Sequence, residues 1–193
     1  KGDHIRVVSP SSSIQSIGGF EANLAAKERL EELGFHVSFS SNYFEHDLFD
    51  SASIVSRVED LHEAFLDPSV DAILATIGGF NCNELLPYLN YDLIAQNPKI
   101  ICGYSDTTAL LNAIYAKTGI QTYMGPSYSS FKMKEGQEYQ SQSWLKAVTQ
   151  DDYDLVPSKE WSSDPWYDPT KPRHFMPTEW KVYKAGKASG IAI

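Results

Sequence analysis

The feature that most constrains the fold is an alternation of two hydrophobic periods over residues 4–126. Short apolar runs recur along this stretch, and between them apolar residues return at every third or fourth position. The runs predict strands at Ile5–Val8, His36–Phe39, Ala72–Thr76, Lys99–Cys102 and Gln121–Met124. The segments between them predict helices over residues 22–33, 54–65, parts of 81–95, and the stretch between Ser105 and Gly119. Such alternation is typical of a parallel sheet with helices on both faces.

We therefore expect an α/β fold of the three-layer, flavodoxin-like or amidotransferase-like type, with residues 1–150 as its nucleophile domain. Residues 136–149 predict one further helix. Residues 150–179 are rich in aspartate, proline and aromatic residues, which favours a long loop or lid. The last residues, Ile191–Ile193, predict a strand. Residues 151–193 are thus interpreted as an aromatic loop and a linker strand that leads to a further domain.

The net charge of −9 argues against binding to nucleic acid or to an anionic membrane surface, since both require clusters of lysine and arginine. No apolar run has membrane-spanning length. The two cysteines, Cys82 and Cys102, form neither a disulfide framework nor a metal quartet. We expect a cytoplasmic protein without a metal or cofactor.

The carboxyl ends of parallel strands form the edge at which ligands bind in such folds. That edge is expected to carry Ser9–Ser13, His46, Gly78–Asn81, Ser105 and Pro126–Tyr128. Ser105 follows the fourth strand directly and precedes a helix, which leaves two interpretations. It either caps the helix, as serine often does, or it is a nucleophile on a tight turn beside the positive helix terminus.

The Gly103–Asp106 sequence Gly-Tyr-Ser-Asp resembles a nucleophile elbow, although it lacks the second glycine of that motif. Gly78 and Gly79 follow the neighbouring strand and can offer a second N–H group to an oxyanion.

Several longer stretches resemble the LD-carboxypeptidase family of serine peptidases. They are residues 76–91, with Gly78-Gly79-Phe80-Asn81; residues 97–110, with Gly103-Tyr104-Ser105-Asp106; residues 118–126; and the opening residues 1–11. Within that family, residues 160–167 and 186–190 are similar to the microcin C immunity branch.

The resemblance implies a Ser–His–Glu triad in which Ser105 is the nucleophile, while the backbone N–H groups of Gly79 and Asp106 form the oxyanion hole. It also implies that the glutamate and the histidine come from a C-terminal catalytic domain beyond Gly190, so that this chain alone is inactive. A homodimer is implied as well. Among histidines within the chain, His46 and His174 lie in predicted loops and are the alternatives as base, because His4, His36 and His62 are placed unfavourably.

The expected reaction is acyl transfer to Ser105 followed by hydrolysis. Its substrate is either a murein tetrapeptide, cleaved at the bond between an L-centre and D-alanine, or an aminoacyl- or peptidyl-nucleotide such as processed microcin C. Trp161 and Trp166 either anchor their loop or stack on the nucleobase of such a nucleotide. The alternative function is a non-catalytic, flavodoxin-like small-molecule binding domain in which Ser105 is a helix cap.

Overall fold

The computed structural model describes residues 2–168, 170–187 and 189. The chain separates into two compact units, Lys1–Lys132 and Met133–Ile193. The predicted strand at Ile191–Ile193 lies outside the described residues. The division into a nucleophile domain, 1–150, and a following segment, 151–193, stays a prediction.

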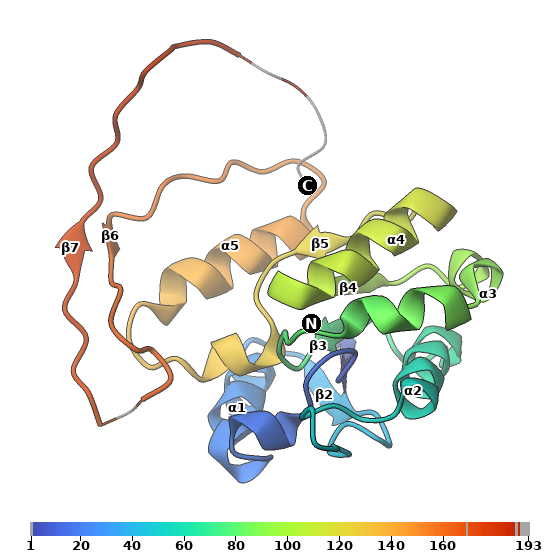
Figure 1. Ribbon diagram of the computed structural model, residues 1–193. Helices are drawn as coiled ribbons and strands as arrows, with labels where there is room; N and C mark the ends of the chain where they lie inside the picture. Colours follow the sequence, from blue (N-terminus) through green and yellow to red (C-terminus); the bar gives the residue numbers. More distant parts are fainter. Residues whose placement is uncertain (1, 169, 188, 190–193) are drawn as a thin grey trace. The chain divides into compact units, whose positions relative to one another are not determined.

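The first unit contains one parallel sheet with the strand order β2-β1-β3-β4-β5 (Figure 1). All five predicted strands are present: β1 His4–Val8, β2 His36–Phe39, β3 Ala72–Ala75, β4 Ile100–Gly103 and β5 Tyr123–Met124. Strand β5 is shorter than predicted, because it pairs with β4 only through Tyr123 and Met124 at the border of the sheet. The predicted α/β class is confirmed.

The predicted helices are also present, with different starts. They are α1 Leu24–Glu32, α2 Ile54–Leu66, α3 Tyr91–Gln96 and α4 Thr108–Thr118. The segment 81–95 divides into a 3-10 helix, η3 Cys82–Tyr88, and α3. Pro87 lies inside η3, and the side chain of Asn90 caps α3 by accepting a hydrogen bond from the N–H of Leu93 at 3.0 Å. A proline and an inserted cap explain why one α-helix does not continue through this segment.

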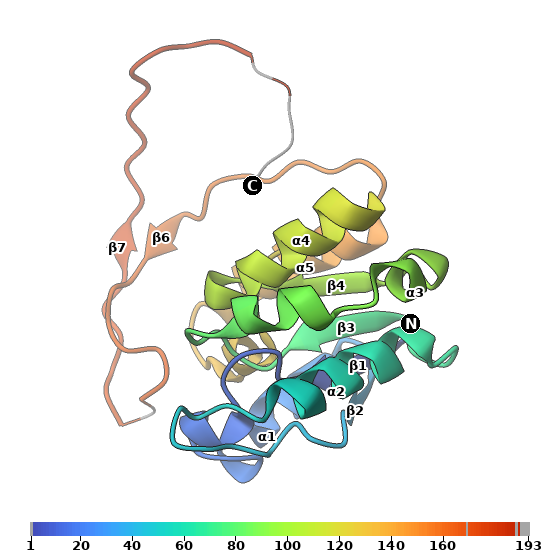
Figure 2. The same ribbon diagram turned by 45° about the vertical axis from the view of Figure 1, so that its right-hand side comes forward.

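Helices α2, α3 and α4 pack beside one another with η3, whereas α1 packs against a 3-10 helix, η5 Tyr128–Lys132. The connection from β1 to β2 runs opposite to the later ones in the strand order. Right-handed crossovers therefore place α1 on the other face of the sheet from α2, α3 and α4. Figure 2 shows β1, β3 and β4 side by side with these helices around them. The main apolar core lies between the sheet and the three-helix layer and includes Val8, Phe65, Ile73, Ile101, Leu110 and Ile114.

The order of the strands decides where a site can form. Strands β1 and β3 are neighbours at the point where successive connections leave in opposite directions, and β4 lies next to β3. The loops that follow these three strands, beginning at Ser9, Thr76 and Tyr104, therefore meet at one edge. This is the position at which doubly wound sheets bind ligands.

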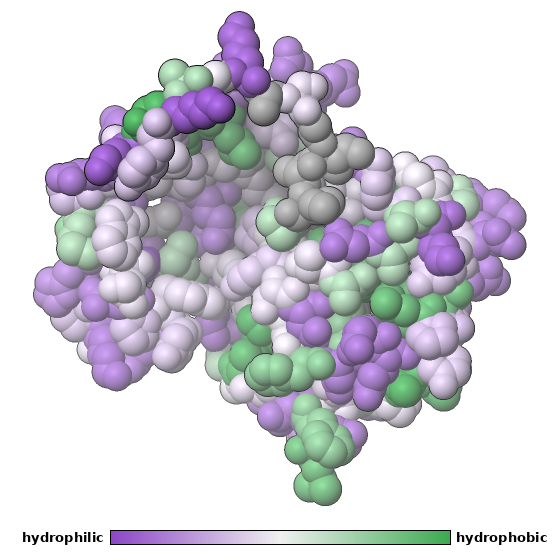
Figure 3. All heavy atoms as spheres, turned by 45° about the horizontal axis from the view of Figure 1, so that its top comes forward, coloured by the Kyte–Doolittle hydropathy of each residue, from purple (hydrophilic) through white to green (hydrophobic). Residues whose placement is uncertain are grey.

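The second unit contains α5 Gln137–Thr149, which agrees with the helix predicted over 136–149. The segment predicted as a loop contains a short antiparallel pair, β6 Glu160–Trp161 with β7 Met176–Pro177. Arg173 supports this unit, because its guanidinium donates to the backbone oxygen of Glu135 at 2.7 Å and stacks over the Phe175 ring. Figure 3 shows polar and apolar side chains mixed over the face that it draws. Within the described part of the chain, none of the helices is long and apolar enough to cross a membrane.

Candidate active site

Ser105 lies at a sharp turn between β4 and the 3-10 helix η4 Ser105–Thr107, which continues into α4. Its φ angle is 58°, in the left-handed region that residues other than glycine seldom adopt. Such a conformation costs on the order of 1–3 kcal/mol and is typically found at functional sites. Gly103 makes the turn possible, because a Cβ at its position would lie 2.8 Å from a side-chain carbon of Thr107 and 3.0 Å from that of Ala75.

The side chain of Ser105 faces the glycine turn after β3, as predicted. Its Oγ lies 3.1 Å from the point that a Cβ on Gly78 would occupy. The residue is exposed, and its hydroxyl makes no hydrogen bond to any described residue. The N-cap position of η4 belongs to Tyr104, and no side chain caps that helix. Ser105 therefore does not act as a side-chain cap, so the first of its two interpretations is wrong.

The turn at Gly78 and Gly79 is pressed against the loop that follows β1. A Cβ on Gly79 would lie 2.2 Å from the Ser11 hydroxyl oxygen and 2.5 Å from that of Ser12. The N–H of Ser12 donates to the carbonyl oxygen of Gly78 at 3.1 Å. Only glycine fits this close approach of two backbone segments.

Two backbone N–H groups near Ser105, that of Gly79 after β3 and that of Asp106 after β4, are available to a ligand. Neither the N–H of Gly79 nor that of Asp106 donates a hydrogen bond within the described ranges. The amide nitrogen of Asp106 lies 3.5 Å from the point that a Cβ on Gly78 would occupy, so it belongs to the same small region as Ser105 Oγ. Unpaired N–H groups beside a hydroxyl are the components of an oxyanion site.

The carboxylate of Asp106 connects the loops that surround Ser105. Its Oδ2 atom accepts hydrogen bonds from the Ser11 hydroxyl at 2.6 Å and from the backbone N–H of Cys82 at 2.8 Å. Burial, together with the negative charge of Asp106, raises the pKa of the Cys82 thiol to about 12. Cys82 is therefore a neutral thiol at physiological pH.

Arg57, which sequence reasoning missed, connects loops at the same edge of the sheet as Ser105. It lies on α2 with a buried side chain, and its guanidinium donates to the backbone oxygens of Pro10 at 3.3 Å and Asn81 at 3.1 Å. It also forms an ion pair with Glu84 at 2.8 Å. The helical period of α2 gave no signal, because an arginine in an amphipathic helix normally points to solvent.

Two of the serines predicted at this edge, Ser9 and Ser13, form hydrogen bonds to the segments that follow β2 and β3. Ser9 Oγ lies 2.9 Å from Thr76 Oγ1 and donates to the carbonyl oxygen of Tyr43 at 2.9 Å, and Ser13 Oγ donates to that same oxygen at 3.2 Å. Their hydrogen-bonding capacity is thus used within the fold. They stabilise the loop after β1.

A pocket of about 370 Å³ opens beside Ser105. It is lined by Ser12, Ser16, Asp50, Ile77, Gly78, Gly79, Phe80, Tyr104 and Ser105. Phe80 is 97% exposed at its rim, so an apolar surface stands next to the polar turn. A pocket of this size accommodates part of a small-molecule substrate.

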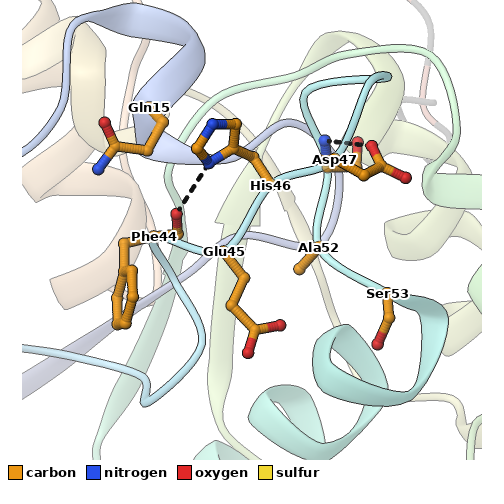
Figure 4. A pocket seen from close by; sticks show the side chains of 8 residues that line it. Gln15, Phe44, Glu45, His46, Asp47, Ala52 and Ser53 are labelled. Atoms are coloured by element: carbon orange, nitrogen blue, oxygen red, sulfur yellow. Dashed lines mark hydrogen bonds between the residues drawn. The ribbon is translucent and has the colours of Figure 1, made fainter.

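His46 does not line the pocket of Ser105. It belongs to a neighbouring pocket of about 380 Å³, together with Gln15, Phe44, Glu45, Asp47, Ser51, Ala52 and Ser53 (Figure 4). There its Nδ1 atom lies 3.4 Å from the carbonyl oxygen of Phe44. His46 and Ser105 were predicted at the same edge of the sheet, and the structure places them in separate pockets.

The other histidines of the first unit have partners elsewhere. His4 Nε2 lies 2.6 Å from the Ser38 hydroxyl, and the ring of His36 packs against that of His4. His62 Nε2 accepts a hydrogen bond from the N–H of Asn90 at 2.9 Å, and burial lowers the pKa of His62. For the described residues, no histidine of this unit bonds to Ser105.

The aromatic residues of the second unit are partly accessible. Trp161 lies in β6 and is 49% exposed, while the ring of Trp166 packs edge-to-face on that of Tyr167 at 6.0 Å. His174 lies in the same unit, with its Nδ1 atom 3.2 Å from an oxygen of Asp164. Among the described residues, no group of three or more histidine, cysteine or carboxylate side chains is placed to hold a metal.

Comparison with known proteins agrees with this architecture. Residues 5–125 match the model of the LD-carboxypeptidase N-terminal domain. A putative carboxypeptidase of Bacillus subtilis, YocD, is 50% identical over 195 residues, which cover the whole chain and 60% of that protein. The microcin C7 self-immunity protein MccF of Escherichia coli is 33% identical over 98% of the chain and 61% of its own length. A probable murein peptide carboxypeptidase of Bacillus subtilis is 35% identical over 67% of the chain and 40% of its own length.

Solved structures give the same result. The crystal structure of an MccF-like protein from Bacillus anthracis superposes with a TM-score of 0.89 at 55% identity, covering 93% of this chain and 54% of that one. The structure of MccF in complex with glutamyl sulfamoyl guanosine superposes with a TM-score of 0.84 at 33% identity, covering 91% and 55%. The chain thus spans about 60% of the length of the first curated relatives. On the family match and these relatives, the chain belongs to the LD-carboxypeptidase family, and residues 5–125 are its N-terminal domain.

Proposed function

We propose that Ser105 is the nucleophile of a serine hydrolase that cleaves an amide bond by acyl transfer. The observation that carries this proposal is the φ angle of 58° at a serine with an exposed, unbonded hydroxyl. A fold keeps such strain at a residue when the position of its side chain matters. The strand–turn–helix geometry is that of a nucleophile elbow, with the side chain beyond the carboxyl end of the sheet.

In the proposed reaction, Ser105 Oγ attacks the substrate carbonyl carbon while a base takes the hydroxyl proton. The oxygen of the resulting tetrahedral intermediate accepts hydrogen bonds from the N–H groups of Gly79 and Asp106. Removal of one such donor typically lowers kcat by about 10²–10³-fold. The amine leaves with a proton from the base, and water then hydrolyses the acyl-enzyme.

The base is proposed to lie outside residues 1–193. His4 and His62 bond to residues other than Ser105, and His46 lines another pocket. The family resemblance assigns the catalytic histidine and glutamate to a C-terminal domain. A serine without a base is a poor nucleophile at neutral pH. We therefore expect residues 1–193 alone to be inactive, and the complete protein, as a homodimer, to be the enzyme.

We propose an aminoacyl- or peptidyl-nucleotide as the substrate, with a murein tetrapeptide as the second candidate. Two findings favour the nucleotide. MccF, whose structure contains glutamyl sulfamoyl guanosine, is a relative over 98% of this chain, whereas the murein-named relative aligns over 67%. The half-exposed ring of Trp161 can also stack on a nucleobase, which is worth about 1–3 kcal/mol. Cys82 and Cys102 are both buried thiols, which supports a reducing compartment such as the cytoplasm.

A fluorophosphonate probe applied to the complete protein tests the proposal. The probe should label Ser105, identified by peptide mass, and the Ser105→Ala variant should lose both the label and hydrolysis of an aminoacyl sulfamoyl adenosine. Residues 1–193 alone serve as the comparison and should show neither. A labelled residue other than Ser105, or full hydrolysis by Ser105→Ala, would refute the assignment, whereas the absence of both labelling and hydrolysis would favour a non-catalytic binding domain.

A further inference from the structure

We propose that the carboxylate of Asp106 is a positioning group that holds the two oxyanion donors, its own N–H and that of Gly79, at a fixed separation. This inference rests on the proposed function, because it assigns a role to the side chain of a residue whose N–H is one of the donors. The reason to look for such a group is geometric. The two donors come from different loops, one after β4 and the other after β3.

The first observation is that one oxygen atom joins three segments. Asp106 Oδ2 accepts from the Ser11 hydroxyl in the loop after β1 and from the N–H of Cys82 at the start of η3. Ser11 and Cys82, which donate these two hydrogen bonds, are both 0% exposed. Hydrogen bonds to a charged acceptor in such surroundings are stronger than ordinary ones.

The second observation is that these contacts enclose Gly79. Cys82 follows Gly79 by three residues, so the carboxylate holds the far end of the turn. On the near side, the Ser11 hydroxyl that it fixes lies 2.2 Å from the point that a Cβ on Gly79 would occupy. A change in the position of either partner would therefore move the Gly79 N–H.

The charge of this carboxylate is not itself useful to the reaction. A negative side chain near a developing oxyanion is unfavourable, and the function of Asp106 is therefore acceptance of two hydrogen bonds. An asparagine oxygen can accept the same two bonds without the charge. The proposal thus predicts that asparagine substitutes for Asp106 and that alanine does not.

The test compares Asp106→Ala, Asp106→Asn and Ser11→Ala in the complete protein. Because a misplacement of about 1 Å can cost about 10²-fold in rate, we expect Asp106→Ala to lower kcat by about 10²-fold with little change in KM. Asp106→Asn should retain kcat within about threefold, because its amide oxygen can accept the same two hydrogen bonds. Ser11→Ala, which removes one of the two anchors, should fall between them.

A matched control and a geometric measurement separate positioning from general stability. Asp67 accepts hydrogen bonds from the N–H and hydroxyl of Ser69 and from the guanidinium of Arg6 at the opposite end of the sheet, so Asp67→Ala removes carboxylate hydrogen bonds without reaching the site. It should lower the melting temperature and leave kcat unchanged. Amide hydrogen exchange at Cys82 should accelerate in Asp106→Ala and stay slow in Asp106→Asn.

The outcomes distinguish this inference from the proposed function. If the fluorophosphonate labels Ser105 in the wild type and Asp106→Ala keeps its kcat, the positioning role is refuted while the nucleophile stands. Equal losses in Asp106→Asn and Asp106→Ala would also refute it, because the charge would then be what matters. If Asp106→Ala does not fold, Ser11→Ala decides: an unchanged kcat overturns the proposal and a reduced kcat with unchanged KM supports it. Absence of any labelling at Ser105 rejects the proposed function itself.

Discussion

Substitution of Gly79 by alanine gives the sharpest test of the oxyanion site, because the structure fixes how far the turn must move. The new Cβ would lie 2.2 Å from Ser11 Oγ, 2.5 Å from Ser12 Oγ and 3.0 Å from the backbone nitrogen of Ser12, whereas ordinary contact begins at 3.4 Å. The worst contact requires a shift of 3.4 − 2.2 = 1.2 Å. Ser11 cannot turn aside freely, since it is buried and its hydroxyl is bonded to Asp106.

A movement of about 1 Å is enough to lose one oxyanion hydrogen bond, because such donors act over about 2.7–3.1 Å. We therefore expect Gly79→Ala to lower kcat by about 10²–10³-fold, with a much smaller change in KM, since the bond forms mainly in the transition state. The assay is steady-state hydrolysis of an aminoacyl sulfamoyl adenosine by the complete protein, together with the rate of fluorophosphonate labelling.

Gly119→Ala is the matched control. Gly119 has a φ angle of 74° at the end of α4, and a Cβ there would meet nothing within 4 Å. The left-handed conformation alone should reduce stability by about 1–2 kcal/mol without a change in kcat. A Gly79→Ala protein that melts near the wild-type temperature and keeps kcat within threefold would show that Gly79 is not an oxyanion donor.

Two further predictions concern the substrate and the buried thiol. Trp161→Ala and Trp166→Ala should raise KM for an aminoacyl sulfamoyl adenosine by about 5–100-fold, as expected from the loss of base stacking, and should spare a murein tetrapeptide; equal losses on both substrates would indicate loop anchors. Because burial raises the pKa of Cys82 from 9.0 to about 12, the folded state favours the neutral thiol, so its stabilising contribution is complete below pH 9 and is lost as the pH rises from 9 towards 12. Urea unfolding at pH 8, 9 and 10 should show the free energy of unfolding falling by up to about 1.4 kcal/mol per pH unit above pH 9. If the free energy of unfolding of Cys82→Ala falls equally steeply, the Cys82 thiol is not the cause.

The chain's local patterns predicted its elements well, because strands and helices are specified by spacing within a few residues. The apolar runs and the helical stripes of the first unit correspond to β1–β5 and to α1–α4. The same local information located the turn at Ser105, where a strand period changes to a helical one after Gly103. It did not predict the short pair β6 and β7, since two-residue strands leave no periodic signal.

Which side chains meet at the sheet edge depends on tertiary packing. Local sequence left Ser105 as either a helix cap or a nucleophile, and the missing cap bond in the structure excludes the first. Asp106 bonds to Ser11, which lies 95 residues away in the sequence, and Arg57 bonds to Asn81, which lies 24 residues away. No periodic pattern connects residues so far apart, because their meeting depends on the order of strands in the sheet. Local sequence patterns thus identify the components of the site, whereas the packing of β1, β3 and β4 side by side sets their arrangement.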